Sequence, residues 1–311
     1  MRGLILLVLA LAVVGVASFW VLTAPQTLAA ADLPAHEPRL DNGERLFYAG
    51  GCASCHAAPG AKGADKLLLT GGLELETDFG TFVVPNISSD PNAGMGGWSD
   101  LEFVNAMKQG VAPDGSHYYP AFPYGSYQFM PIADLLDLKA FMDTLPASPA
   151  VHRDHNMVFP FNIRRLLGGW KFLYWTGETF QPDQNASEQV NLGAYLVIGP
   201  THCGECHTPR DLFGGMKRGE WLAGAPEAEG RGFVPNITPH ETGIADWTES
   251  DIVFALETGF DPDYDTFGGS MVSVQENMAQ LPATDREAIA AYLTSIPGLL
   301  ETPRPEPANN E

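Results

Sequence analysis

Two short cysteine–histidine motifs carry the most specific chemistry in this sequence. Each has the pattern C-x-x-C-H, and together they contain all four cysteines of the 311-residue chain. They consist of Cys52, Cys55 and His56 in the first motif, and of Cys203, Cys206 and His207 in the second. Two cysteines three positions apart on a helical turn can add to the vinyl groups of one haem, and the adjacent histidine then reaches the iron as an axial ligand. The spacing therefore predicts two covalently bound haem c groups, each holding one iron.

Zinc binding and thiol–disulfide chemistry are the competing explanations of the same residues. Two C-x-x-C pairs can form a four-thiolate zinc site, but here the pairs lie far apart in the chain and a histidine directly follows each. A thioredoxin-like redox pair is expected inside a βαβ pattern, which surrounds neither motif. Since both motifs together use every cysteine, none is left for a disulfide framework. We therefore expect haem attachment at both motifs.

The second axial ligand of each iron must come from elsewhere in the chain. Methionine is the usual partner of histidine in cytochromes c, where its thioether raises the reduction potential. In the second half we expect Met271, in a loop before the last helix, with Met278 as the alternative. In the first half we expect Met130, which directly precedes the final helix. His117 is its competitor because imidazole also ligates haem iron.

The segments that position these residues occur twice in the sequence. Each half contains, in the same order, a C-x-x-C-H motif, a Val-Pro-Asn-Ile segment, a Trp-containing helix start and a last helix that ends before proline. Repeats in a constant order indicate duplicated units. We expect an anchor at 1–24, a cytochrome c-type domain at 36–147, an aromatic and basic linker at 148–187, a second such domain at 188–299 and a tail at 300–311.

Each half shows the same expected helices. Ser99-x-x-Glu102 and Thr248-x-x-Asp251 resemble capping boxes, which start a helix, and Gly110 and Gly259 are suited to end it. Other helices are expected at 42–49, 190–198, 133–144 and 284–295. Strand signals are few. The predicted fold is mainly α: two tandem cytochrome c-type domains after an N-terminal transmembrane helix.

The N-terminus predicts the compartment. After Met1-Arg2, the segment from Gly3 to Leu22 is apolar and about 20 residues long, enough to cross a bilayer core of about 30 Å. A secretory signal has a shorter apolar region of about 7–15 residues, so we expect a retained anchor. The alternative is cleavage near Ala29-Ala30-Ala31. We expect Trp20 at the outer interface and the haem domains in the periplasm, beside the bacterial cytoplasmic membrane.

Net charge and the linker suggest partners. The chain has 17 basic and 38 acidic residues, so nucleic acid is excluded as a primary partner, and basic proteins are favoured. In contrast, the linker segment from Phe159 to Trp175 is aromatic and locally basic. We considered two interpretations of this segment. It packs across the domain junction and covers haem edges, or it touches the membrane or a redox partner.

With these residues in view, the chain resembles the di-haem and tri-haem cytochrome c subunits of bacterial membrane-bound dehydrogenases, such as those that oxidise alcohol and gluconate. The resemblance rests on the two C-x-x-C-H motifs, both Pro-Asn-Ile segments, Gly97-Trp-Ser-Asp100 and the segment from His117 to Tyr124. It implies electron transfer from a periplasmic or membrane-bound dehydrogenase to quinone, a soluble cytochrome or an oxidase. It also implies an electron-transfer subunit rather than an enzyme.

Two departures from this family matter. The tri-haem members carry a third motif, which this sequence lacks. The alcohol dehydrogenase subunits hold methionine where this chain has Phe122, and phenylalanine cannot ligate iron. The first haem must therefore use Met130 or His117, or keep an open position. An open position would favour the alternative function, a di-haem peroxidase or thiosulfate-type oxidase.

Overall fold

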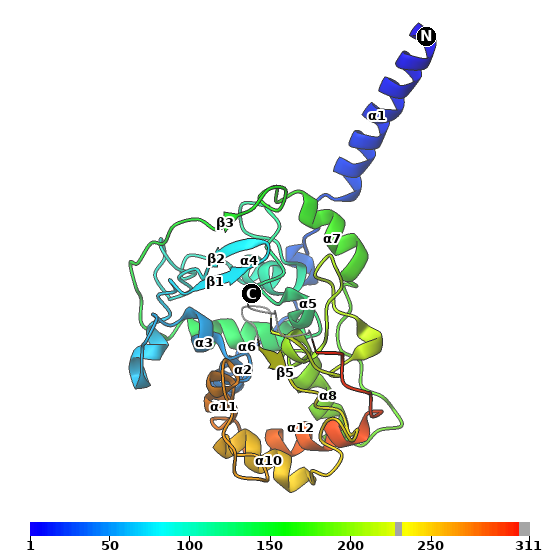
Figure 1. Cartoon of the computed structure of the whole chain (residues 1–311). Coiled ribbons are helices and arrows are strands. Elements are labelled where there is room, and N and C mark those ends of the chain that lie inside the picture. The colour runs from blue at the N-terminus through cyan, green and yellow to red at the C-terminus, as the bar shows by residue number, and fades with distance from the viewer. Residues whose placement is uncertain (228–231, 305–311) are drawn as a thin grey trace, which may run out of the picture.

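Helices joined by long irregular loops make up most of the chain (Figure 1), and the computed structural model describes residues 1–227 and 232–304. The part of the predicted tail from 305 to 311 lies outside the described residues. Helix α1 (Arg2–Leu22) projects away from the rest and has no buried residue. Among the described residues it is the single helix long and apolar enough to cross a membrane.

In the first half, the helix before the motif packs against the last helix. These are α2 (Leu40–Ala49) and α6 (Ile132–Met142), and α3 (Cys52–His56) follows α2 after a two-glycine turn. Helix α4 (Asp100–Val104) begins with the predicted capping box. It continues as one π-helical turn, η3 (Asn105–Gln109), and ends at Gly110 in the left-handed conformation, as predicted.

The second half repeats this plan. Helix α8 (Glu188–Ile198) packs against α12 (Ala283–Ser295), and α9 (Gly204–His207) carries the motif. Helix α10 (Glu249–Thr258) begins with the second predicted capping box and ends at Gly259 with φ 79°. Helix α11 (Met271–Met278) lies between α10 and α12 in the chain and contacts α2 of the first half.

Short strands and short helical segments complete the fold. Strands β1 (Glu74–Thr77), β2 (Gly80–Val83) and β3 (Asn156–Met157) form an antiparallel sheet in that order, and β4 (Ala225–Pro226) pairs with β5 (Phe233–Val234). The expectation of few strands missed these pairs because two to four residues are too short to show alternation. The short helical segments are η1 (Ala30–Asp32), η2 (Gly63–Leu68), α5 (Tyr124–Tyr127) and η4 (Arg218–Glu220).

Both halves share one interior. Buried apolar side chains of α2 and α6 belong to the same cluster as those of α8 and α12. Beside it, the Arg45 guanidinium pairs with the Asp285 carboxylate at 2.5 Å, and the Asp285 side chain is almost fully buried. A buried charge is tolerated when it is paired and hydrogen-bonded in this way. The ion pair therefore joins α2 to α12 across the junction between the halves.

The linker forms a helix that the sequence analysis did not predict, α7 (Leu166–Tyr174). Its Lys171 is buried and donates hydrogen bonds to the carbonyl oxygens of Gln109 and Gly110, at 2.5 and 2.7 Å. These carbonyls lie at the end of η3, where a helix leaves acceptors without partners. The Lys171 ammonium also lies 4.7 Å from the centre of the Tyr124 ring. Lys171 thus fastens the linker to the first half.

Arg164 makes a comparable inward contact. Its guanidinium donates to the His117 carbonyl oxygen at 3.1 Å and lies 4.9 Å from the centre of the Tyr119 ring. For Arg164 and Lys171, these contacts favour the packing interpretation of the linker.

The buried ammonium of Lys171 gives a prediction about pH. Burial lowers the pKa of Lys171 from 10.5 to about 7. Between these pH values the unfolded chain binds more protons at this position than the folded chain, so the free energy of unfolding should rise with pH. We expect the Lys171→Met variant to lose this contribution. Chemical denaturation of both proteins from pH 7 to 10.5 measures the difference between their slopes.

Lys108 also titrates in this range, because burial lowers its pKa to about 8. It is present in both proteins, so its contribution cancels when the two slopes are subtracted. Identical slopes would show that Lys171 does not titrate as described.

Candidate haem-attachment sites

Each C-x-x-C-H motif begins after a residue in the left-handed conformation. Gly51, with φ 56°, precedes Cys52, and His202, with φ 40°, precedes Cys203. Left-handed backbone is easily adopted by glycine and is uncommon for other residues. The chain therefore turns sharply between the preceding helix and the motif in both halves.

A backbone carbonyl orients the histidine of each motif. His56 Nδ1 lies 2.9 Å from the Pro85 oxygen, and His207 Nδ1 lies 2.8 Å from the Pro235 oxygen. A carbonyl oxygen can only accept, so Nδ1 carries the hydrogen and Nε2 keeps its lone pair. Burial lowers the pKa of His56 to about 4 and also lowers that of His207, so both rings are neutral at pH 7. Neutral imidazole with a fixed tautomer is the form that ligates a metal.

The asparagine after each proline holds the carbonyl in place. Asn86 donates to the oxygens of Ser148 and Ala150, at 2.7 and 2.9 Å. Asn236 donates to the Leu299 oxygen at 2.7 Å. Each asparagine also accepts from the amide two residues further on. The repeated Val-Pro-Asn-Ile segment is therefore a support for the histidine, a role that the sequence analysis did not assign.

Two buried leucines form a second pair of supports. Leu69 and Leu222 are fully buried, with φ values of 51° and 61°. Such backbone costs about 1–3 kcal/mol in a residue with a side chain, so the surroundings must enforce it. Two residues on, the amides of Gly71 and Gly224 donate to the carbonyls of His56 and His207. The shared pattern Leu-x-Gly was a signal that could have indicated these positions.

The cysteines of the two motifs have matching surroundings. Cys52 and Cys203 are partly buried, whereas Cys55 and Cys206 are exposed. Burial raises the pKa of the Cys52 thiol to about 12 and also raises that of Cys203. A raised pKa disfavours the thiolate, which is the form that binds zinc or attacks a disulfide. Within 1–227 and 232–304, no cluster of three or more His, Cys, Asp or Glu side chains is placed to hold a metal ion. This donor set fits haem attachment.

Equivalent positions in the two halves can be counted from matching backbone contacts. Val111 bridges to His117, and Phe260 bridges to Thr266. The amides of Tyr118 and Phe267, which follow His117 and Thr266, donate to the carbonyl oxygens of Gly110 and Gly259, the glycines that end the helices. Five residues beyond His117 and Thr266 lie Phe122 and Met271. Phe122 in the first half therefore corresponds to Met271. The expectation that Met271 lies in a loop was wrong, because it is the first residue of helix α11.

Met130 has a different counterpart. Met130 is almost fully buried and precedes Pro131, which caps α6, just as Leu281 precedes Pro282 at the start of α12. The carbonyl of Met130 accepts from Lys108, and that of Leu281 accepts from Arg286. The two methionines predicted as ligands, Met130 and Met271, thus occupy non-equivalent positions.

The remaining candidates are also placed. Met278 is buried at the end of α11, three residues before Leu281. His117 Nε2 donates to the Thr23 oxygen at 3.0 Å, at the end of α1. Its other ring nitrogen, Nδ1, is buried without a hydrogen-bond partner. His117 therefore packs between the first half and the end of the N-terminal helix.

The two motif segments meet at the junction between the halves. His202, directly before the second motif, approaches the Gly50 oxygen at 3.3 Å through Nε2. Its ring lies 5.6 Å from the Tyr127 ring, edge to face. On the other side, Asn277 of α11 donates to Ser54 inside the first motif at 2.8 Å. Each attachment segment is thus held partly by residues of the other half.

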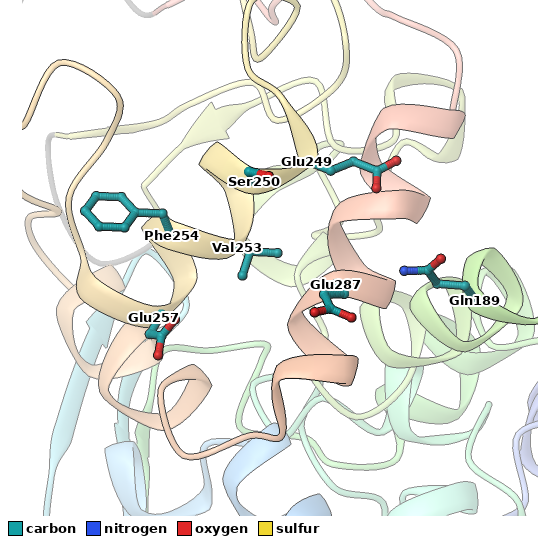
Figure 2. A pocket seen from close by; sticks show the side chains of 7 residues that line it. All are labelled: Gln189, Glu249, Ser250, Val253, Phe254, Glu257 and Glu287. Atoms are coloured by element: carbon teal, nitrogen blue, oxygen red, sulfur yellow. The ribbon is translucent and has the colours of Figure 1, made fainter.

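A shallow pocket lies elsewhere in the second half (Figure 2). Carboxylates and one aromatic ring dominate its lining, which comes from α8, α10 and α12. The lining residues are Gln189, Glu249, Ser250, Val253, Phe254, Glu257 and Glu287. They include none of the cysteines, histidines or methionines considered as haem ligands.

Comparisons with known proteins agree with this geometry. Residues 40–146 match the cytochrome c family model. The chain is 52% identical over 257 residues to the diheme cytochrome c-type of Cereibacter sphaeroides, covering 83% of this chain and 86% of that protein. It is 37% identical to a subunit of the nicotinate dehydrogenase of Pseudomonas putida, covering 83% of this chain and 21% of that subunit. It is 32% identical to the fructose dehydrogenase cytochrome subunit of Gluconobacter japonicus, covering 86% of this chain and 54% of that subunit. The chain therefore spans less than two thirds of these two dehydrogenase subunits.

The asparagine supports can be tested by mutation. Asn86→Ala leaves the carbonyls of Ser148 and Ala150 without this donor, in a largely buried site. An unsatisfied buried group costs about 1–3 kcal/mol, so we expect the free energy of unfolding to fall by about 2–3 kcal/mol. Denaturant titration of the haem-loaded protein measures this loss. Asn92→Ala, at an exposed position nearby, is the matched control and should change stability by less than about 0.5 kcal/mol. Equal effects of the two substitutions would contradict the supporting role.

Proposed function

The chain belongs to the cytochrome c family, and from this premise we propose that it is a di-haem electron carrier anchored in the bacterial cytoplasmic membrane, with its haem domains in the periplasm. The observation that carries this proposal is the contact between the two motif segments, where His202 approaches the Gly50 carbonyl. Two redox centres exchange electrons only when they are close. Attachment segments held against each other meet that requirement within one chain.

Two haems in two tandem domains are the second part of the proposal. We assign one domain to 36–147 and one to 188–299, joined by the linker at 148–187. The paired contacts of His56 with Pro85 and of His207 with Pro235 support this assignment. The name of the diheme relative, which the chain matches over 86% of that protein's length, supports the count of two.

The chain's own residues would hold both haems. When bound, haem c supplies one-electron chemistry at its iron. We assign Cys52, Cys55, Cys203 and Cys206 to covalent attachment, and His56 and His207 to iron ligation through Nε2. We assign Met130 and Met271 as the second protein ligand of each iron. An iron that holds two protein ligands would suit a carrier rather than an enzyme.

Membrane attachment is assigned to α1. Its 21 residues have no buried side chain and a high mean hydropathy, 2.8. At 1.5 Å per residue they span about 31 Å, close to the thickness of a bilayer core. An uncleaved helix of this kind would keep the haem domains next to membrane-bound partners.

A dehydrogenase is the proposed electron donor. Relatives include cytochrome subunits of fructose, alcohol and gluconate dehydrogenases, each 30–32% identical to this chain. We propose a soluble cytochrome, the quinone pool or an oxidase as acceptor. The net charge of −21 favours a basic surface on a soluble partner, and that attraction should weaken with salt.

One observation favours a second candidate function. Phe122, in the first half, corresponds to Met271, and a phenyl ring cannot ligate iron. If Met130 does not ligate iron in its place, the first haem has an open position. The chain would then suit a redox enzyme such as a peroxidase or a thiosulfate-type oxidase, which needs an exchangeable position and acid–base groups beside it.

Ligand substitutions separate these two functions. Met271→Ala should remove the near-infrared band of methionine-ligated ferric haem from one haem, and Met130→Ala should remove it from the other. His117→Ala should leave both bands, because His117 contacts Thr23. Near-infrared magnetic circular dichroism records the bands. A high-spin haem in the unmutated protein, together with fast cyanide binding, would contradict the carrier and support the enzyme.

The electron-carrier function is tested with the complete, haem-loaded chain purified from its native membranes. We expect a dehydrogenase to co-purify, its substrate to reduce the haems, and redox titration to show two centres. The variant with both Cys203→Ala and Cys206→Ala is the control, and should keep one haem per chain and one centre. Haems that no co-purifying dehydrogenase can reduce would contradict the assigned donor.

A further inference from the structure

Helix α7 exposes an apolar face to its surroundings. Leu166, Phe172 and Leu173 are 40%, 75% and 65% exposed. Gly168 and Lys171, on the opposite face, are buried. A surface helix of a soluble protein normally turns its apolar side inward. The polarity of α7 is therefore inverted, with the charged side chain inside and the apolar side chains outside.

The segment before α7 extends this surface. From Val158 to Ile163 its large apolar side chains are also exposed, including Phe159 at 74%. No acidic residue occurs between Asp154 and Glu178, although the chain has 38 acidic residues. We call the exposed side chains of 158–163 and of α7 the α7 surface. Contiguous exposed apolar surface of this kind marks a site of contact with a protein or a membrane.

This surface begins where α1 ends. The Arg165 guanidinium lies 4.5 Å from the centre of the Trp20 ring and also donates to the Trp20 carbonyl. A Cβ on Gly168 would lie 2.3 Å from the Thr23 oxygen, and one on Gly169 would lie 3.7 Å from the Phe19 ring. Gly168 therefore allows α7 to lie directly against the end of α1, and Gly169 lies in ordinary contact with Phe19. In Figure 1, α7 lies at the end of the molecule from which α1 projects.

The contact between α7 and the end of α1 also determines how deep α7 would lie in a bilayer. If α1 crosses the bilayer core, its end at Leu22 lies near the outer boundary of that core. Phe19 is three residues earlier, which is about 4.5 Å further in at 1.5 Å per residue. Because Gly169 lies beside Phe19, α7 is at the level of the lipid headgroups and the first acyl carbons. Helices of this kind bury their apolar face about 5–10 Å into that boundary.

We propose that the α7 surface lies in the outer leaflet of the lipid bilayer and is a second membrane contact beside α1. This inference rests on the proposed membrane anchor. Lipid is favoured over a protein partner because the surface is continuous with α1. In addition, Arg164 and Lys171 donate inward, to the backbone carbonyls of His117 and Gln109, rather than toward a partner.

Photocrosslinking of the full chain tests the proposal. Phe172 and Phe159 are each replaced by p-benzoylphenylalanine, whose ketone inserts into nearby C–H bonds under light. The haem-loaded protein is placed in phosphatidylcholine–phosphatidylglycerol nanodiscs and, in parallel, kept in native membranes. Intact-mass spectrometry then reports whether a lipid has been added. Absorption spectra of the haems check that each variant is folded.

Two further positions make the outcomes distinguishable. Val8, inside α1, takes the same probe as a positive control, and Tyr264, 76% exposed in the second half, is the negative control. We expect lipid adducts at Phe172, Phe159 and Val8 and none at Tyr264. A lipid adduct at Val8 without one at Phe172 or Phe159 would overturn the α7 proposal alone. Adducts to protein at Phe172 in native membranes would show that the α7 surface contacts a protein partner instead of lipid, and would overturn the proposal. No lipid at Val8 would overturn the anchor itself.

Discussion

The hydrogen bond from a histidine ring to a proline carbonyl is the constraint on which both candidate sites depend. His56 and His207 each donate from Nδ1, so each Nε2 is left as the only ring atom able to bind a metal. The proline carbonyl is held in place because Asn86 ties its segment to the start of the linker and Asn236 ties its segment to the end of the second half. Helix packing, the asparagine contacts and the strained leucines all contribute to the position of the proline carbonyl oxygen in each half.

The linker illustrates how charge and apolar surface can separate within one segment. Lys171 and Arg164 donate hydrogen bonds to backbone carbonyls of the first half, and these bonds hold the linker against it. The apolar side chains of the same segment are then left outside. An acidic protein thereby gains one exposed segment without acidic residues of its own, 155–177, at the base of the helix that is long enough to span a membrane.

Local signals were predicted well from the sequence, and contacts between distant segments were not. The capping boxes at Ser99 and Thr248 depend on residues three apart, and both were predicted correctly. Helix α7 was missed because Gly168 and Gly169 argue against a helix, and the close approach that explains Gly168 involves Thr23, which is distant in the sequence. The correspondence of Phe122 with Met271 required counting from backbone bridges. The positive φ of Leu69 likewise depends on contacts that no short pattern contains.

The close approach of Gly168 to Thr23 has a mechanical consequence. Gly168 of α7 packs against the backbone and side chain of Thr23, directly after α1. If α1 spans a bilayer as proposed, this contact would couple the tilt of α1 to the orientation of the body. The same side of the protein would then face partners that lie in the plane of the membrane.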